Sequence, residues 1–335
     1  MKHINKLFKY LIIISALNIV FGANVSAQAV PGPDENIPFL VTFGKDAQTS
    51  WGDPNFYQIF FFLIPREYTQ RFYIRVFDPD CGGEHDELNG NEWNTRTMFS
   101  VYGGVGADPE KHEEARGIEP GLNYKTGNQL ASRVFGVDPR YDNNYYPFGP
   151  FTATEGELNE RWNSYVFKVI CEGISGSDGN LYRYFLSRDA NSNVPIEGAN
   201  AFTYTYTFRM WNDFKSVSHI YPFVDSGVVS IRQSNFDWDD DGKIVVASRY
   251  KQGVEVRVSG DDEWITSTIP IEPAEINSSL DFQFHKRQDE LIRNNNVAIR
   301  LQNQRGDALR FYSSPIGGVP VYNPRTSITR IPPQR

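Results

Sequence analysis

Five carboxylates lie close together in one segment of the chain, directly after an apolar run expected to be a strand. They are Asp78, Asp80, Glu84, Asp86 and Glu87. Carboxylates this close in sequence repel one another unless a positive charge lies among them. Calcium takes about six to eight oxygen ligands, and loops between strands can supply them. The spacing therefore predicts a calcium site in this segment, the N-terminal acidic loop. The alternative is an exposed acidic turn that is solvated and has only a structural role.

A second acidic run consists of Asp237, Asp239 and Asp241, followed by Gly242. It matches the first half of the calcium-loop pattern D-x-D-x-D-G. The bidentate glutamate of that pattern would fall at Ser248, and the residues after 242 have the composition of a strand. Two interpretations remain open: a second calcium site, and an Asp-Gly hairpin turn with extra acidic residues.

The spacing of the N-terminal acidic loop resembles that of a known family of calcium-binding sandwiches. Asp78, Asp80 and Asp86 follow a predicted strand at offsets of zero, two and eight, and Leu88 and Gly90 lie just beyond. This resembles the third loop of the synaptotagmin-type β-sandwich modules over about fifteen of the 335 residues. The resemblance implies calcium binding by this loop. We do not extend it to the phospholipid binding of that family.

Aromatic side chains are concentrated between residues 141 and 151, interleaved with Asp, Asn, Gly and Pro. The candidate ligand-binding residues are Tyr141, Tyr145, Tyr146 and Phe148. Exposed rings beside polar groups are typical of surfaces that contact sugars or proteins. The alternative is that these rings fold inward and cover one face of a sheet.

The sequence has two cysteines, Cys81 in the acidic loop and Cys171 at the end of a strand-like run. In an exported protein they could form a disulfide that holds the loop against a neighbouring strand. Two unpaired thiols are the other possibility, and spacing does not decide between them.

Signals for catalysis are weak. The histidines form no HExxH pattern, and neither a Cys-His pattern nor G-x-S-x-G is present. Glycoside hydrolysis needs only two suitably placed carboxylates, so a secreted carbohydrate-active enzyme stays an alternative. The sequence favours a protein that is not an enzyme.

The first 27 residues have the order of a secretory signal peptide, with a basic start, a short apolar middle and a small-residue end at Val25-Ser26-Ala27. We expect the mature chain to begin at Gln28 and no later segment to span a membrane. The formal net charge of −8 disfavours nucleic acid as a partner. The expected location is the periplasm, the cell surface or the extracellular space of a bacterium.

Many short alternating runs, few helical patterns and frequent Gly, Pro and Asn predict an all-β protein. A chain of this length predicts two domains. We expect a flexible lead-in over residues 28–36, a jelly-roll-like β-sandwich over 37–214, an immunoglobulin-like β-sandwich over 215–314 and an extended basic tail over 315–335.

These features together predict an exported binding or assembly module whose acidic loop is braced by calcium. Its expected partner is a glycan or a cell-surface protein. The alternatives are a secreted carbohydrate-active enzyme that uses carboxylates of the first domain, and a purely structural exoprotein.

Overall fold

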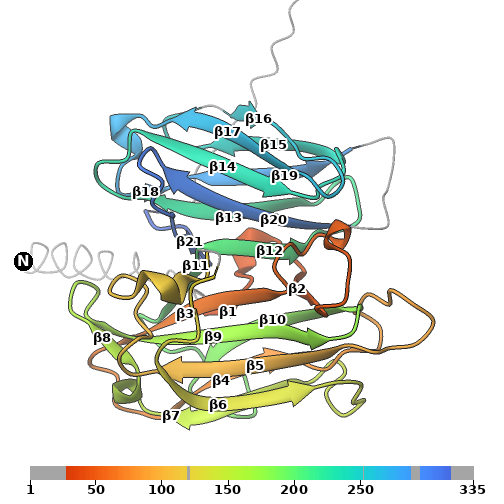
Figure 1. The fold of residues 1–335 in the computed structure, drawn as a ribbon. Coiled ribbons are helices and arrows are strands. Elements are labelled where there is room, and N and C mark those ends of the chain that lie inside the picture. Colours follow the sequence, from red (N-terminus) through yellow and green to blue (C-terminus); the bar gives the residue numbers. More distant parts are fainter. Residues whose placement is uncertain (1–27, 119–120, 252, 288–294, 318–335) are drawn as a thin grey trace, which may run out of the picture.

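The computed structural model describes residues 28–118, 121–251, 253–287 and 295–317. Within these residues the chain is all-β, with two antiparallel sheets packed on each other (Figure 1). This confirms the predicted fold class of packed β-sheets. No helix among the described residues is long and apolar enough to cross a membrane. The predicted signal peptide and the part of the predicted tail from residue 318 lie outside the described residues.

The first sheet has nine strands. Eight of them form a continuous path, and the short strand β1 (Ala29–Val30) pairs with β10. The path, from one edge to the other, is β7 (Tyr145–Phe151), β4 (Phe72–Phe77), β10 (Gly179–Ser187), β2 (Phe39–Phe43), β12 (Thr205–Arg209), β20 (Asn296–Asn303), β14 (Ser230–Phe236) and β17 (Trp264–Pro270).

The second sheet has twelve strands. Its path is β6 (Asn128–Phe135), β5 (Arg96–Gly103), β9 (Ser164–Ser175), β3 (Tyr57–Pro65), β11 (Asn200–Thr203), β21 (Phe311–Tyr312), β13 (Val217–Val224), β19 (Asp281–Lys286), β15 (Gly242–Ala247) and β16 (Val254–Val256). Two short strands lie beside this path, β8 (Glu157–Asn159) on β9 and β18 (Ser278–Ser279) on β13.

Both sheets continue from the N-terminal half of the chain (residues 28–199) into the C-terminal half (residues 200–317). In the first sheet β12 joins β2 to β20, and in the second β11 and β21 join β3 to β13. Figure 1 shows these strands at the junction of the two halves. The boundary expected between residues 214 and 215 falls between β12 and β13, at a place where neither sheet ends.

The main core also runs through both halves. Tyr206 of β12 packs edge-on against Phe60 of β3, with ring centroids 5.5 Å apart, and Phe208 packs against Phe284 of β19 at 5.3 Å. These contacts connect the two sheets and the two halves in one apolar cluster. Burial of this continuous apolar surface is therefore the main reason that the halves stay together.

The apolar run predicted as a strand buried on both faces is β3. Phe60, Phe62 and Ile64 belong to the main core, whereas Ile59 and Phe61 belong to a second cluster on the opposite face of the sheet. Alternate residues of a strand point to opposite faces, so both faces of β3 must be covered. This explains why polar residues are nearly absent from the strand.

Short 3-10 helices lie in the connections: η1 (Pro33–Glu35), η2 (Thr49–Trp51), η3 (Glu113–Arg116), η4 (Ala153–Glu155) and η5 (Pro273–Glu275). The segment 28–36, expected as a flexible lead-in, instead forms β1 and η1, and Gln28 and Glu35 are buried. The bond from the Leu186 N–H to the Gln28 carbonyl extends the pairing of β1 with β10.

Candidate functional site

The N-terminal acidic loop begins where β4 ends. Asp78 has a positive φ of 56°, a conformation that Asp adopts more easily than most residues. The side chains of Asp78 and Asp80 are 0% and 1% exposed. One oxygen of Asp78 accepts the Asn143 N–H at 2.9 Å, and one oxygen of Asp80 accepts the Asp138 N–H at 3.1 Å. The other oxygen of each, Oδ2 of Asp78 and Oδ1 of Asp80, has no hydrogen-bond partner among the described residues.

The other predicted ligands of this loop lie in different surroundings. Asp86 accepts the N–H groups of Gly82 at 2.7 Å and Leu181 at 2.6 Å, one on each oxygen. Glu87 forms an ion pair with Arg209 of β12 and also accepts the side-chain amide of Asn296. Glu84 is exposed.

Glu87 therefore connects the loop to the C-terminal half. The five predicted ligands do not converge on one point.

Burial sets the electrostatics of this loop. It raises the pKa of Asp78 to about 6 and that of Asp80 to about 7, and the nearby carboxylate of Asp142 adds to both shifts. Burial also raises the pKa of Asp86 well above its ordinary value. Bound protons and backbone N–H groups thus reduce the repulsion among these carboxylates. From the sequence, a cation was expected to do so.

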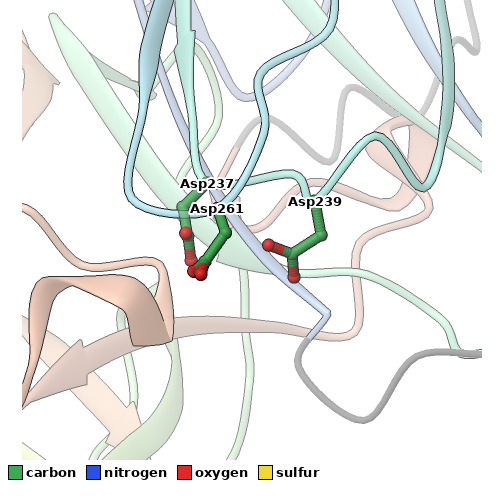
Figure 2. A group of neighbouring side chains, drawn as sticks. All are labelled: Asp237, Asp239 and Asp261. Atoms are coloured by element: carbon green, nitrogen blue, oxygen red, sulfur yellow. The ribbon is translucent and has the colours of Figure 1, made fainter.

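The second acidic run contributes to a group of three carboxylates, here called the carboxylate triad. Asp237 and Asp239 follow β14, and Asp261 lies in the connection from β16 to β17. Their oxygens lie within 4.8 Å of one another, and Figure 2 shows the three side chains gathered together. Among the described residues, the triad is the one such group of three or more ligand side chains.

The triad is partly open to solvent. Asp237 is buried, Asp239 is half-buried and Asp261 is exposed. Asp237 accepts the Asp262 N–H at 2.6 Å, which fixes the strand end against the β16–β17 connection. Burial raises the pKa of Asp239 to about 6, and repulsion from Asp261 adds to the shift. The Asp239 carboxylate is therefore mainly ionised at neutral pH. Carboxylate oxygens are hard ligands that suit a divalent cation.

Asp241, the third residue of the predicted run, forms an ion pair with Lys286 of β19 instead. Both side chains are 1% exposed. Asp261 was not predicted, because it lies more than twenty residues further along the chain. The signal that could have revealed it is the acidic run Asp261-Asp262-Glu263 directly before a predicted strand.

The aromatic segment divides between the two faces of β7. Phe148 is buried in the main core, and Tyr146 packs directly against it with ring centroids 4.9 Å apart. Tyr141, from the connection before β7, packs against Phe135 and Tyr146. Tyr145 points to the other face, as the alternation of a strand requires. Its hydroxyl accepts the side-chain amide of Asn193 at 2.9 Å.

A pocket of about 410 Å³ lies on this outer face of the first sheet. Tyr145, Asn193, Arg183 and Trp211 line it, together with residues of the N-terminal segment. Trp211 is 45% exposed. Arg183 is the charged side chain of the described lining, and its guanidinium lies 4.4 Å from the ring centre of Phe77. Nε of Arg183 has no hydrogen-bond partner in the described part of the chain.

The two cysteines are separate, buried thiols. Cys171 lies in the main core between the two sheets, whereas Cys81 lies in the acidic loop. Burial raises the pKa of both thiols, which keeps them protonated and unreactive. Of the two possibilities left open by the sequence, the structure contains the unpaired one.

Comparison with known proteins adds no identity. The sequence matches no protein-family model, and no curated protein matches it.

Proposed function

We propose that this protein is an exported binding module of a bacterial surface or its surroundings, with a glycan as its ligand. The observation that carries the proposal is the pocket on the outer face of the first sheet. Its lining combines the exposed ring of Trp211 and the half-buried ring of Tyr145 with planar polar groups, a combination that suits sugar rings and their hydroxyls. A cell-surface protein is the alternative partner.

Two lining side chains of the pocket, Tyr145 and Asn193, are held in place before any ligand arrives. Tyr145 is fixed by Asn193, by the guanidinium of Arg75 at 4.2 Å from its ring centre, and by Phe77 at 5.1 Å. A preorganised site loses less conformational freedom on binding. Arg183 favours a sugar that carries a carboxylate, because guanidinium groups pair with planar anions.

The alternative of an enzyme receives less support from the same geometry. It would use carboxylates of the N-terminal half, but Asp78 and Asp80 are 0% and 1% exposed. Both oxygens of Asp86 already accept backbone N–H groups. A substrate must contact a catalytic acid directly or through one water molecule, and these side chains offer no such contact.

The calcium part of the proposal rests on the carboxylate triad. Its ligands come from two connections that are distant in sequence, so an ion there would hold the ends of β14 and β17 together. Binding to the native state alone stabilises a protein by mass action, by about 2.7 kcal/mol at a ligand concentration of one hundred times Kd.

The binding proposal is tested with acidic and neutral polysaccharide panels. We expect retention of the wild-type protein without turnover, and a roughly tenfold weaker affinity for Trp211→Ala, corresponding to about 1.4 kcal/mol. Tyr250→Ala is the matched control, because Tyr250 is exposed and does not line the pocket. Equal affinities of Trp211→Ala and wild type would exclude this pocket.

The calcium proposal is tested by thermal melting in calcium and in chelator. We expect calcium to raise the Tm of wild type and of Asp240→Asn by more than it raises that of Asp239→Asn or Asp261→Asn. Asp240 is an exposed neighbour in the same turn and lies outside the triad. Asn tolerates the positive φ of Asp239 and Asp240, so backbone strain does not distort the comparison. A wild-type Tm that is identical in calcium and chelator contradicts the proposal.

A further inference from the structure

The two halves of the chain have the same strand order. Read outward from the centre of the first sheet, β2-β10-β4-β7 corresponds to β12-β20-β14-β17. In the second sheet, β3-β9-β5-β6 corresponds to β13-β19-β15-β16. The matching strands also follow one another in the same order along the chain, and Figure 1 shows the two sets stacked beside each other.

The correspondence extends to single residues at the ends of β4 and β14. Each strand ends in a phenylalanine followed by Asp-x-Asp: Phe77-Asp78-Pro79-Asp80 in one half and Phe236-Asp237-Trp238-Asp239 in the other. The first aspartate of each has a φ of 56°. A glycine lies five residues after that aspartate in both halves, at Gly83 and Gly242.

The connections that face these strand ends correspond as well. Tyr145 lies opposite Phe77, and Trp264 lies opposite Phe236. Three residues before each of these aromatic residues is an aspartate, Asp142 in the N-terminal half and Asp261 in the C-terminal half.

The same two hydrogen bonds join each strand end to its facing connection. The Asp78 N–H donates to the Asn144 carbonyl, and the Asn143 N–H donates to Oδ1 of Asp78. In the other half the Asp237 N–H donates to the Glu263 carbonyl, and the Asp262 N–H donates to Oδ1 of Asp237. Asn143 and Asp262 both have positive φ, at 59° and 51°.

We infer that the chain contains two copies of one eight-stranded sandwich unit, and that Asp78, Asp80 and Asp142 form a second divalent-cation site equivalent to the triad. This inference rests on the proposed function, because the ion expected at the second site is the calcium proposed for the triad. It makes the C-terminal half a second jelly-roll-like unit in place of the expected immunoglobulin-like one. It also replaces Glu84, Asp86 and Glu87 as ligands with Asp142.

An independent observation supports the second site. Oδ2 of Asp78 and Oδ1 of Asp80 are buried and have no hydrogen-bond partner among the described residues. An unpartnered buried carboxylate oxygen is unfavourable, and a cation would satisfy it. Two other residues predicted as ligands already have partners. Asp86 accepts backbone N–H groups, and Glu87 pairs with the guanidinium of Arg209.

The second site differs from the triad in respects that bear on affinity. Its carboxylate oxygens are not gathered within 4.8 Å of one another as those of the triad are. Oδ1 of Asp142 accepts the side-chain amide of Asn143 at 3.2 Å. Oδ2 of Asp80 accepts the Asp138 N–H, whereas Asp239 and Asp261 form no hydrogen bonds within the described residues. Asp142 is half-buried, and Gly83 leaves room for its carboxylate, since a side chain at position 83 would overlap it. We therefore expect weaker calcium binding in the N-terminal half than at the triad.

The test is the number of calcium ions bound per chain, measured by isothermal titration of the chelator-treated protein from residue 28 onward. We expect two ions for wild type and for Glu84→Gln, an exposed member of the same loop outside the proposed site. Asp142→Asn and Asp239→Asn should each bind one ion, and the double variant none. Asp142 is half-buried and Asn is close to Asp in size, so we expect the substitution to leave the fold intact, which circular dichroism checks.

The outcomes separate this inference from the proposal on which it rests. One ion for wild type that is lost in Asp239→Asn and kept in Asp142→Asn overturns the second site and leaves the triad in place. No ion in wild type overturns the calcium part of the proposed function and the second site with it.

Discussion

The N-terminal and C-terminal halves present the same Phe-Asp-x-Asp turn at the end of a central strand, but they surround it differently. The third and fourth residues after the first aspartate are Cys81 and Gly82 in one half and Asp240 and Asp241 in the other. The N-terminal turn is buried, and its charge is limited by raised pKa values and backbone N–H groups. The C-terminal turn is half open and more acidic. The same Phe-Asp-x-Asp sequence at a strand end can therefore carry a closed or an accessible set of carboxylates.

The extra carboxylate of the C-terminal turn gives the largest expected difference between the halves. Asp241 is buried and paired with Lys286, whose ammonium also donates to the side chain of Asn295 at 2.6 Å. Lys286→Met removes the ammonium group from beside the buried carboxylate of Asp241 and should lower the free energy of unfolding by about 3–5 kcal/mol. Denaturant unfolding measures this change.

Lys243→Met is the control, because Lys243 is exposed on the neighbouring strand β15. It should change the free energy of unfolding by less than about 0.5 kcal/mol. If Lys286→Met falls in the same range, the ion pair does not hold the turn in place.

Gly83 and Gly242, which lie at equivalent positions, allow the rigidity of the two turns to be compared. A Cβ on Gly242 would overlap the backbone carbonyl of His285 on the paired strand, whereas the atoms nearest to a Cβ on Gly83 belong to the carboxylate of Asp142. We expect Gly242→Ala to lower the free energy of unfolding by about 2–3 kcal/mol, since backbone cannot move aside. Gly83→Ala should lower it by about 1 kcal/mol, because φ there is +80° and Asp142 can rotate away.

Gly90→Ala is the matched control, because no atom lies within 4 Å of the added Cβ. The Tm values of the three variants rank their losses of stability. If Gly83→Ala loses more stability than Gly242→Ala, the N-terminal turn is the more rigid of the two, contrary to this expectation.

The sequence predicted the fold class because alternation and turn residues are local properties. It did not predict how the strands distribute between sheets. Residues 201–210 alternate as one strand, yet the chain passes from β11 in the second sheet to β12 in the first at Tyr204. Phe202 belongs to the second apolar cluster, which also contains Phe61, whereas Tyr206 belongs to the main core. An uninterrupted alternation therefore concealed a change of sheet.

The candidate site was predicted in part for a related reason. Asp78, Asp80, Asp237 and Asp239 were found because they follow strand-like runs at short spacing. Asp142 and Asp261 join them only through the pairing of β4 with β7 and of β14 with β17. The repeat itself was missed because few residues of each copy match. The third carboxylate of each set is brought in by strand pairing, which a local sequence pattern does not reveal.

The connection between the third and fourth strands of the second sheet gives the smallest and most specific difference between the halves. In the N-terminal half this connection, from β5 to β6, covers the outer face of β9. There Nζ of Lys168, a fully buried side chain, donates to the Tyr124 carbonyl at 2.6 Å and to the Thr126 hydroxyl at 2.9 Å. The corresponding connection from β15 to β16 is short. Burial lowers the pKa of Lys168 to about 7, with Glu114 opposing the shift.

This buried amine predicts a pH dependence that belongs to the N-terminal half. Between pH 7 and pH 9 the unfolded lysine, with a pKa of about 10.4, keeps its proton while the folded one loses it. The folded state then binds fewer protons, so stability rises with pH in this window, by at most about 1.4 kcal/mol per pH unit. We expect wild type to gain about 2 kcal/mol relative to Lys168→Met from pH 7 to pH 9. Denaturant unfolding at each pH measures it, and Lys125→Met, which removes an exposed neighbour, should run parallel to wild type. Parallel curves for Lys168→Met and wild type would mean that Lys168 stays charged beneath its covering segment.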